Sequence, residues 1–307
     1  MSEAVHAEVY QEIVEEWRRV RLLIEPRLRA AAKDASEAGL VEVSEYILRG
    51  GKRFRGFLTV LVAEALGAAP EQALDAAVAI EMVHSASLAI DDIIDKDQVR
   101  RGLPVAWMVH GIEKTVLASL LMIPVAQSMV ERYGVKALGR VIRAWERTVR
   151  GEIIDYLLAS RLGPQRYVEL VDLKTGSLFQ LAAALGALAA GRDDMLPSLE
   201  AYGLALGRVY QIADDAADYH AYMEGRRRKL DPSERLFEKW ATTVLGASPG
   251  MPAVEAALRY VARQAREAGN ALRGLPDGRR KRVLQAIPWF MVEKLLEESN
   301  LQLPQET

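Results

Sequence analysis

Three aspartates follow a long apolar stretch in the first third of the chain, and their spacing could bind a metal. Asp91 and Asp92 lie four and three residues before Asp95, so on a helix one face carries all three. Like charges this close repel one another unless cations neutralise them. Carboxylate oxygens are hard ligands that suit Mg²⁺, which often bridges carboxylates to a substrate phosphate. The guanidinium groups of Arg100 and Arg101, which follow, are suited to binding the same phosphate.

A solvated acidic helix end with a basic turn is the alternative interpretation of one such cluster. The same Asp-Asp-x-x-Asp spacing recurs at Asp214, Asp215 and Asp218, again at the end of an apolar, helix-compatible stretch. The duplication favours a shared function over two independent solvated helix ends. Facing each other across a cavity, the two motifs could hold several Mg²⁺ ions and one diphosphate between them.

Two other features could contribute to an anion site. The basic residues Lys52, Arg53 and Arg55 follow a flexible glycine pair, which would suit an anion cradle, although a basic surface loop is the alternative. His84 lies two helical turns before Asp91 on the same face, where it could serve the acidic cluster or simply fill the core.

Some polar residues carry less information by themselves. Lys174 and Thr175 precede a glycine, a pattern that is also common at helix ends. Glu152 and Asp155 receive no role from spacing alone. The four histidines are scattered and do not form a metal-binding cluster, and no glycine-rich nucleotide-binding fingerprint follows a strand.

Helices must position all of these side chains. Apolar periodicity and glycine or proline breaks predict helices over residues 8–29, 41–48, 57–66, 72–94, 112–133, 136–158, 178–190, 197–217, 234–245, 253–268 and 278–298. No strand-like alternation, linker or long repeat is present in the sequence. We therefore expect an all-α fold in a single domain, residues 1–307.

Composition narrows the class of protein. Half of the 307 residues are hydrophobic, which is enough for a substantial core, and the net charge of -2 gives no general attraction to nucleic acid. The absence of cysteine excludes disulfides and fits a reducing compartment. The longest apolar run, 116–126, contains a proline and is too short to span a bilayer. We expect a cytoplasmic protein with no nucleic-acid partner and no transmembrane segment.

These motifs, in this order, resemble those of the trans-isoprenyl diphosphate synthase family, which makes farnesyl, geranylgeranyl and longer polyprenyl diphosphates. The resemblance extends from about residue 45 to about residue 220 and rests on four stretches: 50–55 (Gly-Gly-Lys-Arg-Phe-Arg), 91–104 (the first aspartate motif with its arginines), 174–176 (Lys-Thr-Gly) and 211–218 (the second aspartate motif). It implies a helical bundle of the isoprenoid synthase type around a deep central cavity, assembled as a homodimer.

The same resemblance implies the ligands and the roles of the residues. Three Mg²⁺ ions per active site would hold an allylic diphosphate between the two aspartate motifs. The positions that match isopentenyl diphosphate ligands are Lys52, Arg55, His84 and Arg101. The positions that match the allylic diphosphate site and its catalytic groups are Arg100, Lys174, Thr175 and Gln211, with Lys174 and Thr175 stabilising the carbocation.

Four departures from the family pattern stand out. Gly56 replaces a usual proline, Ile90 replaces a common histidine, and Ser119-Leu120 replaces a usual Gly-Asp pair. The lysine-containing stretch that follows the second motif in the family is not recognisable. Residues 226–229, Arg-Arg-Arg-Lys, could supply a cation in its place, with Arg228 or Lys229 nearest by spacing.

The predicted function is a chain-elongating prenyltransferase that condenses isopentenyl diphosphate with an allylic diphosphate. The alternatives are a non-catalytic or regulatory subunit of a heteromeric prenyl synthase and a class I terpene cyclase. Ala86 and Ser87 lie about one turn before Asp91 on its face and would form the floor for the growing chain. In the family, large aromatics at these positions stop growth at fifteen carbons. Because both residues are small here, we expect twenty carbons or more, with geranylgeranyl diphosphate first and a longer product as the alternative.

Overall fold

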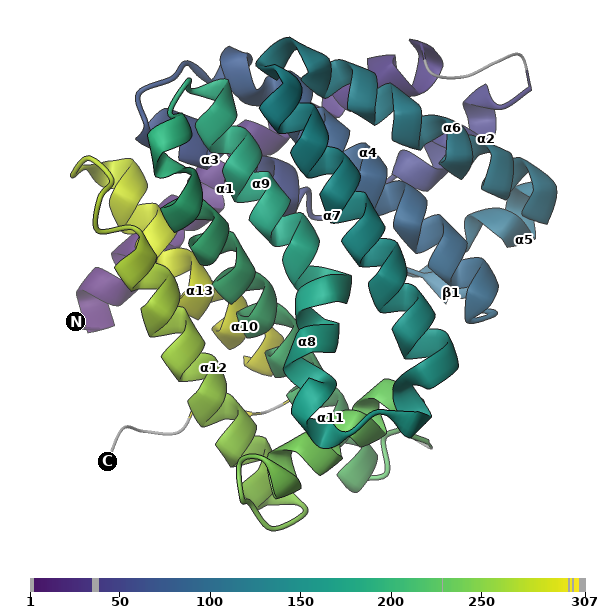
Figure 1. The fold of residues 1–307 in the computed structure, drawn as a ribbon, viewed down its shortest axis with the longest axis vertical. Coiled ribbons are helices and arrows are strands. Elements are labelled where there is room, and N and C mark those ends of the chain that lie inside the picture. Colours follow the sequence, from purple (N-terminus) through teal and green to yellow (C-terminus); the bar gives the residue numbers. More distant parts are fainter. Residues whose placement is uncertain (1–2, 35–38, 228, 298, 300, 304–307) are drawn as a thin grey trace. The chain divides into compact units, whose positions relative to one another are not determined.

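Helices make up nearly all of the computed structural model (Figure 1). It describes residues 3–34, 39–227, 229–297, 299 and 301–303. The α-helices there are α1 (Glu3–Asp34), α2 (Val41–Leu48), α3 (Phe54–Ala65), α4 (Pro70–Ile94), α5 (Ala106–His110), α6 (Ile112–Val130), α7 (Val135–Ile153), α8 (Tyr167–Val171), α9 (Ser177–Ala189), α10 (Leu196–Met223), α11 (Pro232–Thr243), α12 (Met251–Ala271) and α13 (Arg279–Glu297). The all-α class predicted from the sequence is confirmed.

Single-turn helices complete the helical segments. Two are π-helices, η2 (Ile154–Leu158) and η5 (Asp172–Gly176), and the other four are 3₁₀ turns: η1 (Glu131–Tyr133), η3 (Ala159–Arg161), η4 (Pro164–Arg166) and η6 (Asp193–Met195). Short π-helical segments frequently mark functional sites, because the extra residue in the turn shifts the direction of the side chains that follow.

The contacts within the chain group it into two compact units. The first-motif unit comprises Glu12–Ile142 and Leu181–Asp194, and the second-motif unit comprises Met1–Gln11, Arg143–Gln180 and Met195–Thr307. Each unit contains one of the two aspartate motifs. The single domain expected over residues 1–307 stays a prediction.

Helix α4 is the central element of the first-motif unit, where it packs against α3 and α6. Its length and apolar composition would also allow it to cross a membrane, but 78% of its most hydrophobic window is buried inside the protein. That burial is the behaviour of a core helix. The apolar residues that surround the aspartate motif therefore hold α4 inside its unit.

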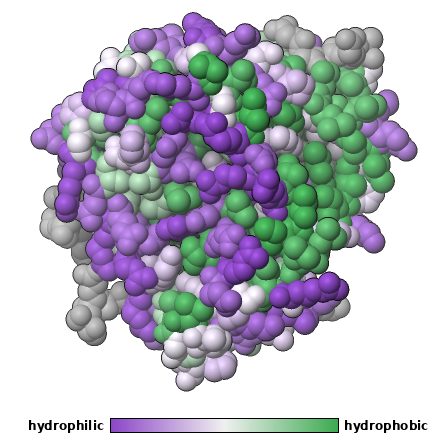
Figure 2. Space-filling model, viewed as in Figure 1, coloured by the Kyte–Doolittle hydropathy of each residue, from purple (hydrophilic) through white to green (hydrophobic). Residues whose placement is uncertain are grey.

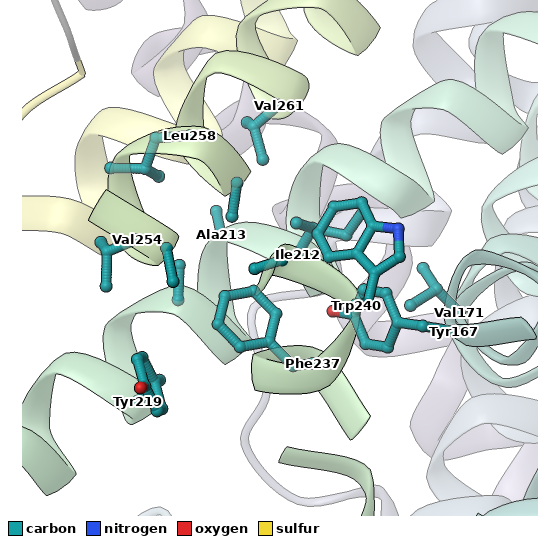
Figure 3. Close-up of a cluster of buried hydrophobic side chains, with 14 of the residues drawn as sticks. Tyr167, Val171, Ile212, Ala213, Tyr219, Phe237, Trp240, Val254, Leu258 and Val261 are labelled. Carbon is teal, nitrogen blue, oxygen red and sulfur yellow. The ribbon is translucent and has the colours of Figure 1, made fainter. Parts of the chain in front are cut away.

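Helix α10 has the same central role in the second-motif unit, beside α12 and α13 (Figure 1). Its buried face contributes Val209, Ile212, Ala213 and Ala216 to a hydrophobic cluster with α8, α11 and α12 (Figure 3). Aromatic rings from three helices, Tyr167, Tyr219, Phe237 and Trp240, fill this cluster. Large rings bury much apolar area each, so they fix the angle at which α8 meets α10.

A tight hairpin interrupts the helices after α4. It was not predicted, because the sequence shows no strand-like alternation there. Strand β1 (Val99–Arg100) pairs antiparallel with β2 (Leu103–Pro104), and Arg100 lies opposite Leu103. The two connecting residues, Arg101 and Gly102, have positive φ angles of 55° and 74°. Two consecutive positive φ values are the mark of a type I′ turn, which suits the twist of a hairpin.

A cavity of about 1090 Å³ lies in the first-motif unit against α1, α2 and His110. Arg49 and Gly50 are part of its lining, but none of the predicted site residues is. The deep central cavity expected for the active site stays a prediction.

Candidate active site

The second aspartate motif forms a polar stripe along α10. Gln211, Asp214, Asp215 and Asp218 follow an i, i+3, i+4, i+7 spacing, and all four are half-buried. Apolar residues between them, such as Ile212, are fully buried. The 3.6-residue period therefore separates a core face from a carboxylate face on one continuous helix.

Both carboxylate oxygens of Asp215 accept hydrogen bonds. The Tyr167 hydroxyl donates to Oδ2, and Gln211 Nε2 donates to Oδ1 at 2.9 Å. Burial is the main cause that raises the pKa of Asp215 to about 7, while these hydrogen bonds oppose the rise and the charges of Asp214 and Asp218 add to it. A bound cation would favour the ionised form instead.

Gln211 also links the second motif to the Lys-Thr pair. Its Oε1 accepts a hydrogen bond from Thr175 Oγ1 at 2.6 Å, so one amide bridges Thr175 and Asp215. The amide oxygen of Gln211 faces Thr175, whose hydroxyl donates, and the amide nitrogen faces Asp215, whose carboxylate accepts. Thr175, Gln211 and Asp215 are thus one connected set, and their roles in a reaction stay predictions.

Lys174 is held by two carboxylates that the sequence alone did not assign. Its Nζ lies 2.5 Å from Asp155 Oδ2 and 3.1 Å from Glu152 Oε2. Asp155 belongs to π-helix η2 and Lys174 to π-helix η5. Gly151 allows the two segments to meet, because an added Cβ there would lie only 2.7 Å from the backbone nitrogen of Lys174. The two π turns and the glycine therefore set the position of the lysine.

The three carboxylates of the first motif differ in their surroundings. Asp92 is buried and accepts a hydrogen bond from Arg100 Nε at 2.6 Å, whereas Asp91 is half-buried and Asp95, at the end of α4, is exposed. Burial raises the pKa of Asp92, although its bond to Arg100 opposes the rise. Trp107 Nε1 donates to the Asp92 carbonyl at 3.0 Å and fastens the helix end to α5.

Arg101 lies against the glycine pair that precedes α3. A Cβ added at Gly51 would lie 2.8 Å from Arg101 Nη1 and 3.2 Å from Arg53 Nη1. Gly51 also has a φ of 96°, in a region that favours glycine. The glycine pair thus lets two guanidinium groups approach the backbone, which brings the basic stretch 52–55 and the arginines that follow the first motif to one place.

His84 is part of this basic cluster. Arg55 Nη1 lies 2.9 Å from His84 Nε2. Burial, together with the charges of Arg55 and Arg101, holds the pKa of His84 well below its ordinary value. The ring is therefore neutral, and since arginine can only donate, Nε2 accepts and the proton resides on Nδ1.

Arg53 and Gly56 support the cluster from inside. Arg53 is 2% exposed and its Nε lies 3.0 Å from Glu25 Oε1. Glu81 Oε1 accepts a hydrogen bond from the Gly56 N–H at 2.8 Å, a bond that proline could not donate. A Cβ at Gly56 would also lie 2.8 Å from Ile24 Cδ1. The departure from the family proline therefore has a structural reason in this chain.

The remaining predicted residues are placed as follows. Lys52 is exposed, and Ala86 and Ser87 are buried on α4, with Ser87 Oγ donating to the His84 carbonyl at 2.9 Å.

On the basic stretch 226–229, Arg227 pairs with Asp218 Oδ2 at 2.7 Å and also with Glu234. Arg227 thus forms an ion pair with the second motif. Arg228 lies outside the described residues, and Lys229 is exposed.

Both aspartate motifs offer carboxylate oxygens as possible metal donors. Across residues 3–34, 39–227 and 229–297, no single group of three or more histidine or carboxylate side chains is arranged to hold a metal ion. Mg²⁺ usually needs only one or two carboxylates, and substrate phosphates and waters complete its octahedron. The oxygen-only donors of both motifs fit that mode of binding.

Comparisons with known proteins agree with this geometry. A family model described as polyprenyl synthetase matches residues 37–233, which include both aspartate motifs. The chain belongs to the polyprenyl synthetase family. A hexaprenyl pyrophosphate synthase from Saccharolobus solfataricus is 37% identical over 208 residues, which cover 67% of this chain and 72% of the relative. A geranylfarnesyl diphosphate synthase from Methanosarcina mazei is 32% identical over 233 residues, which cover 75% and 78%.

Solved structures support the same assignment. A polyprenyl synthase from Caulobacter crescentus, complexed with calcium and isoprenyl diphosphate, has a TM-score of 0.75 and 26% identity to this chain, with 91% of this chain and 97% of that one covered. The predicted family and enzyme class, a trans-prenyltransferase, are therefore confirmed. The named relatives differ in product length, so the family alone does not fix the product.

The predicted site residues fall into two groups, one in each unit. The group in the first-motif unit consists of Lys52, Arg55, His84, Asp91, Asp92, Asp95, Arg100 and Arg101. The group in the second-motif unit consists of Lys174, Thr175, Gln211, Asp214, Asp215 and Asp218, and the roles of both groups stay predictions. Sequence reasoning missed Glu152, Asp155 and Tyr167. For Glu152 and Asp155, the i, i+3 spacing near the end of α7 was a signal, but for Tyr167 none was present.

Proposed function

We propose that this prenyltransferase condenses isopentenyl diphosphate with an allylic diphosphate in a Mg²⁺-dependent reaction. The observation that carries the proposal is the chain of hydrogen bonds Thr175–Gln211–Asp215, which joins the Lys-Thr pair to the second motif. Such a connection would hold a carboxylate and a hydroxyl within reach of one ligand. An acidic surface without function would not require it.

Different residues would bind the two substrates. Arg55 and Arg101, with Lys52, would bind the diphosphate of isopentenyl diphosphate, and neutral His84 would hold Arg55 in place. Carboxylates of both motifs would hold the ions, three per active site, around the allylic diphosphate. Bound Mg²⁺ would neutralise the charge that develops on the diphosphate as it leaves.

Lys174 and Thr175 would lie beside the allylic carbon. We propose that Thr175, fixed by Gln211, and Lys174, fixed by Asp155 and Glu152, set the electrostatics where the carbocation forms. The double bond of isopentenyl diphosphate then attacks the cation, a carbon–carbon bond forms, and a proton leaves. Preorganised groups of this kind need no reorganisation during the reaction, which is why they accelerate it.

The direct test is an assay of purified protein with Mg²⁺, isopentenyl diphosphate and an allylic primer. An elongated diphosphate supports the proposal, whereas a cyclic hydrocarbon would identify a terpene cyclase. Activity that begins only after a second subunit is added would identify a regulatory chain. A regulatory chain is the second candidate because Arg227 forms an ion pair with Asp218 and because the family's lysine stretch is missing.

We also propose a product of twenty carbons or more, geranylgeranyl diphosphate first. The support is the small size of Ala86 and Ser87, which lie about one turn before Asp91 on α4. A cytoplasmic location is part of the same proposal, supported by the absence of cysteine.

A homodimer is the proposed assembly, and α6 offers the surface for it. Leu117 and Leu120 are 55% and 58% exposed, and they lie three residues apart on one side of the helix. Hydrophobic residues gather at the upper right of Figure 2, where α6 lies in Figure 1. An exposed apolar helix face of this kind is stabilised when a second copy covers it.

A further inference from the structure

Tyr167 connects the hydrophobic core to the second motif. It belongs to α8, is 1% exposed, and packs its ring against Phe237 and Trp240, with ring centroids 5.8 Å and 4.8 Å away (Figure 3). Two aromatic neighbours on α11 thus fix the plane and position of the ring. A side chain held this firmly can present its hydroxyl group in only one direction.

That hydroxyl group points at a carboxylate of the second motif. Tyr167 donates to Asp215 Oδ2, while Gln211 donates to Oδ1, so the carboxyl group has one donor on each oxygen. A carboxylate with a single donor can still rotate about its Cβ–Cγ bond. With a second donor from another helix, rotation would break one bond or the other, which fixes the remaining lone pairs in direction.

We propose that Tyr167 is a positioning residue that aims Asp215 at the Mg²⁺–diphosphate complex. The inference rests on the proposed function and assigns to this reaction a residue outside all of the motifs. Hydrogen-bonding partners behind metal-binding carboxylates characteristically tune affinity in this way. The alternative is that the hydroxyl only stabilises the core, in which case its loss changes stability alone.

The test variant is Tyr167→Phe, which keeps the ring and removes one oxygen atom. Its matched control is Tyr219→Phe in the same cluster, where the hydroxyl donates to Glu238 Oε1 at 2.8 Å and contacts no aspartate of the motif. Both variants remove a tyrosine hydroxyl that is bonded to a carboxylate. They differ in whether that carboxylate belongs to the second motif.

Two readouts separate positioning from stability. The first is the Mg²⁺ concentration that gives half of the maximal elongation rate, which should rise about 10- to 100-fold for Tyr167→Phe and stay unchanged for Tyr219→Phe. The second needs no turnover: Mg²⁺ with inorganic pyrophosphate should raise the Tm of the wild type and of Tyr219→Phe more than that of Tyr167→Phe.

A third comparison shows whether Tyr167 acts through Asp215. On an Asp215→Ala background, Tyr167→Phe should have no further effect on the pyrophosphate-dependent shift in Tm, because the group that it positions is absent. Equal Mg²⁺ dependence in Tyr167→Phe and Tyr219→Phe would overturn the positioning role of Tyr167 and leave the proposed function standing. The same holds if Tyr167→Phe has an undiminished effect on the shift in Tm in the Asp215→Ala background. A wild type that neither elongates a primer nor responds to Mg²⁺ and pyrophosphate would instead overturn the proposed function.

Discussion

At the scale of single residues, the carboxylates of the two motifs differ in their surroundings. Asp92 forms an ion pair with Arg100, and Asp218 forms one with Arg227. Asp215 instead accepts hydrogen bonds from the neutral side chains of Tyr167 and Gln211. Ion pairs with arginine satisfy a carboxylate within the protein, so a metal must compete for it. Asp215 accepts its two hydrogen bonds from neutral donors, so a cation could bind it without displacing an arginine, as it would have to at Asp218.

Removing one carboxylate from either motif should abolish most of the activity. We expect Asp91→Ala and Asp215→Ala each to lower turnover by about two to three orders of magnitude, the loss typical when a charge-stabilising group is removed. Asp193→Ala, on an exposed aspartate outside both motifs, should leave turnover unchanged. Circular dichroism checks that helicity is intact. Near-normal turnover in either motif variant would refute the assignment of the metal ligands.

At the scale of elements, α4 should determine the length of the product. Ser87 is 7% exposed, whereas Ala86 is fully buried. Ala86→Phe would therefore overpack the core, at a cost of about 1–3 kcal/mol, and Ser87→Phe is the better test. We expect Ser87→Phe to shorten the product toward fifteen carbons and Ser87→Ala to leave it unchanged. Chromatography of the dephosphorylated products measures both. An unchanged length in Ser87→Phe, or a wild type that already stops at fifteen carbons, would place the floor elsewhere.

The elements were largely predictable from the sequence, because α4 and α10 carry their motifs at helical spacing after long apolar runs. Features created by tertiary contact were not. Tyr167 lies 48 positions before Asp215, and nothing in its local sequence indicates that α8 turns its hydroxyl toward α10. The π turns η2 and η5 also depend on packing, since they meet through the close approach at Gly151. The hairpin after α4 escaped prediction because each strand has only two residues.

At the scale of the whole molecule, the exposed side of α6 should be the dimer interface. Each large apolar side chain that becomes fully buried stabilises an assembly by about 1.5–3 kcal/mol. We expect the double variant Leu117→Glu with Leu120→Glu to convert the dimer to a monomer, as measured by light scattering after gel filtration. Leu22→Glu, at a leucine on α1 that is 75% exposed, is the matched control and should remain dimeric. A monomeric wild type, or a double variant that stays dimeric, would contradict the assignment.

We propose that carboxylates of both aspartate motifs bind one diphosphate through Mg²⁺, and a cycle of binding measurements can check this. Calorimetry with a non-hydrolysable allylic diphosphate analogue would compare the wild type, Asp91→Ala, Asp215→Ala and the double variant. We predict Mg²⁺-dependent binding in the wild type, a loss of about tenfold or more in each single variant, and a double variant whose loss is smaller than the two combined, because the groups share one complex. Purely additive losses, or wild-type binding that persists without Mg²⁺, would contradict a shared site.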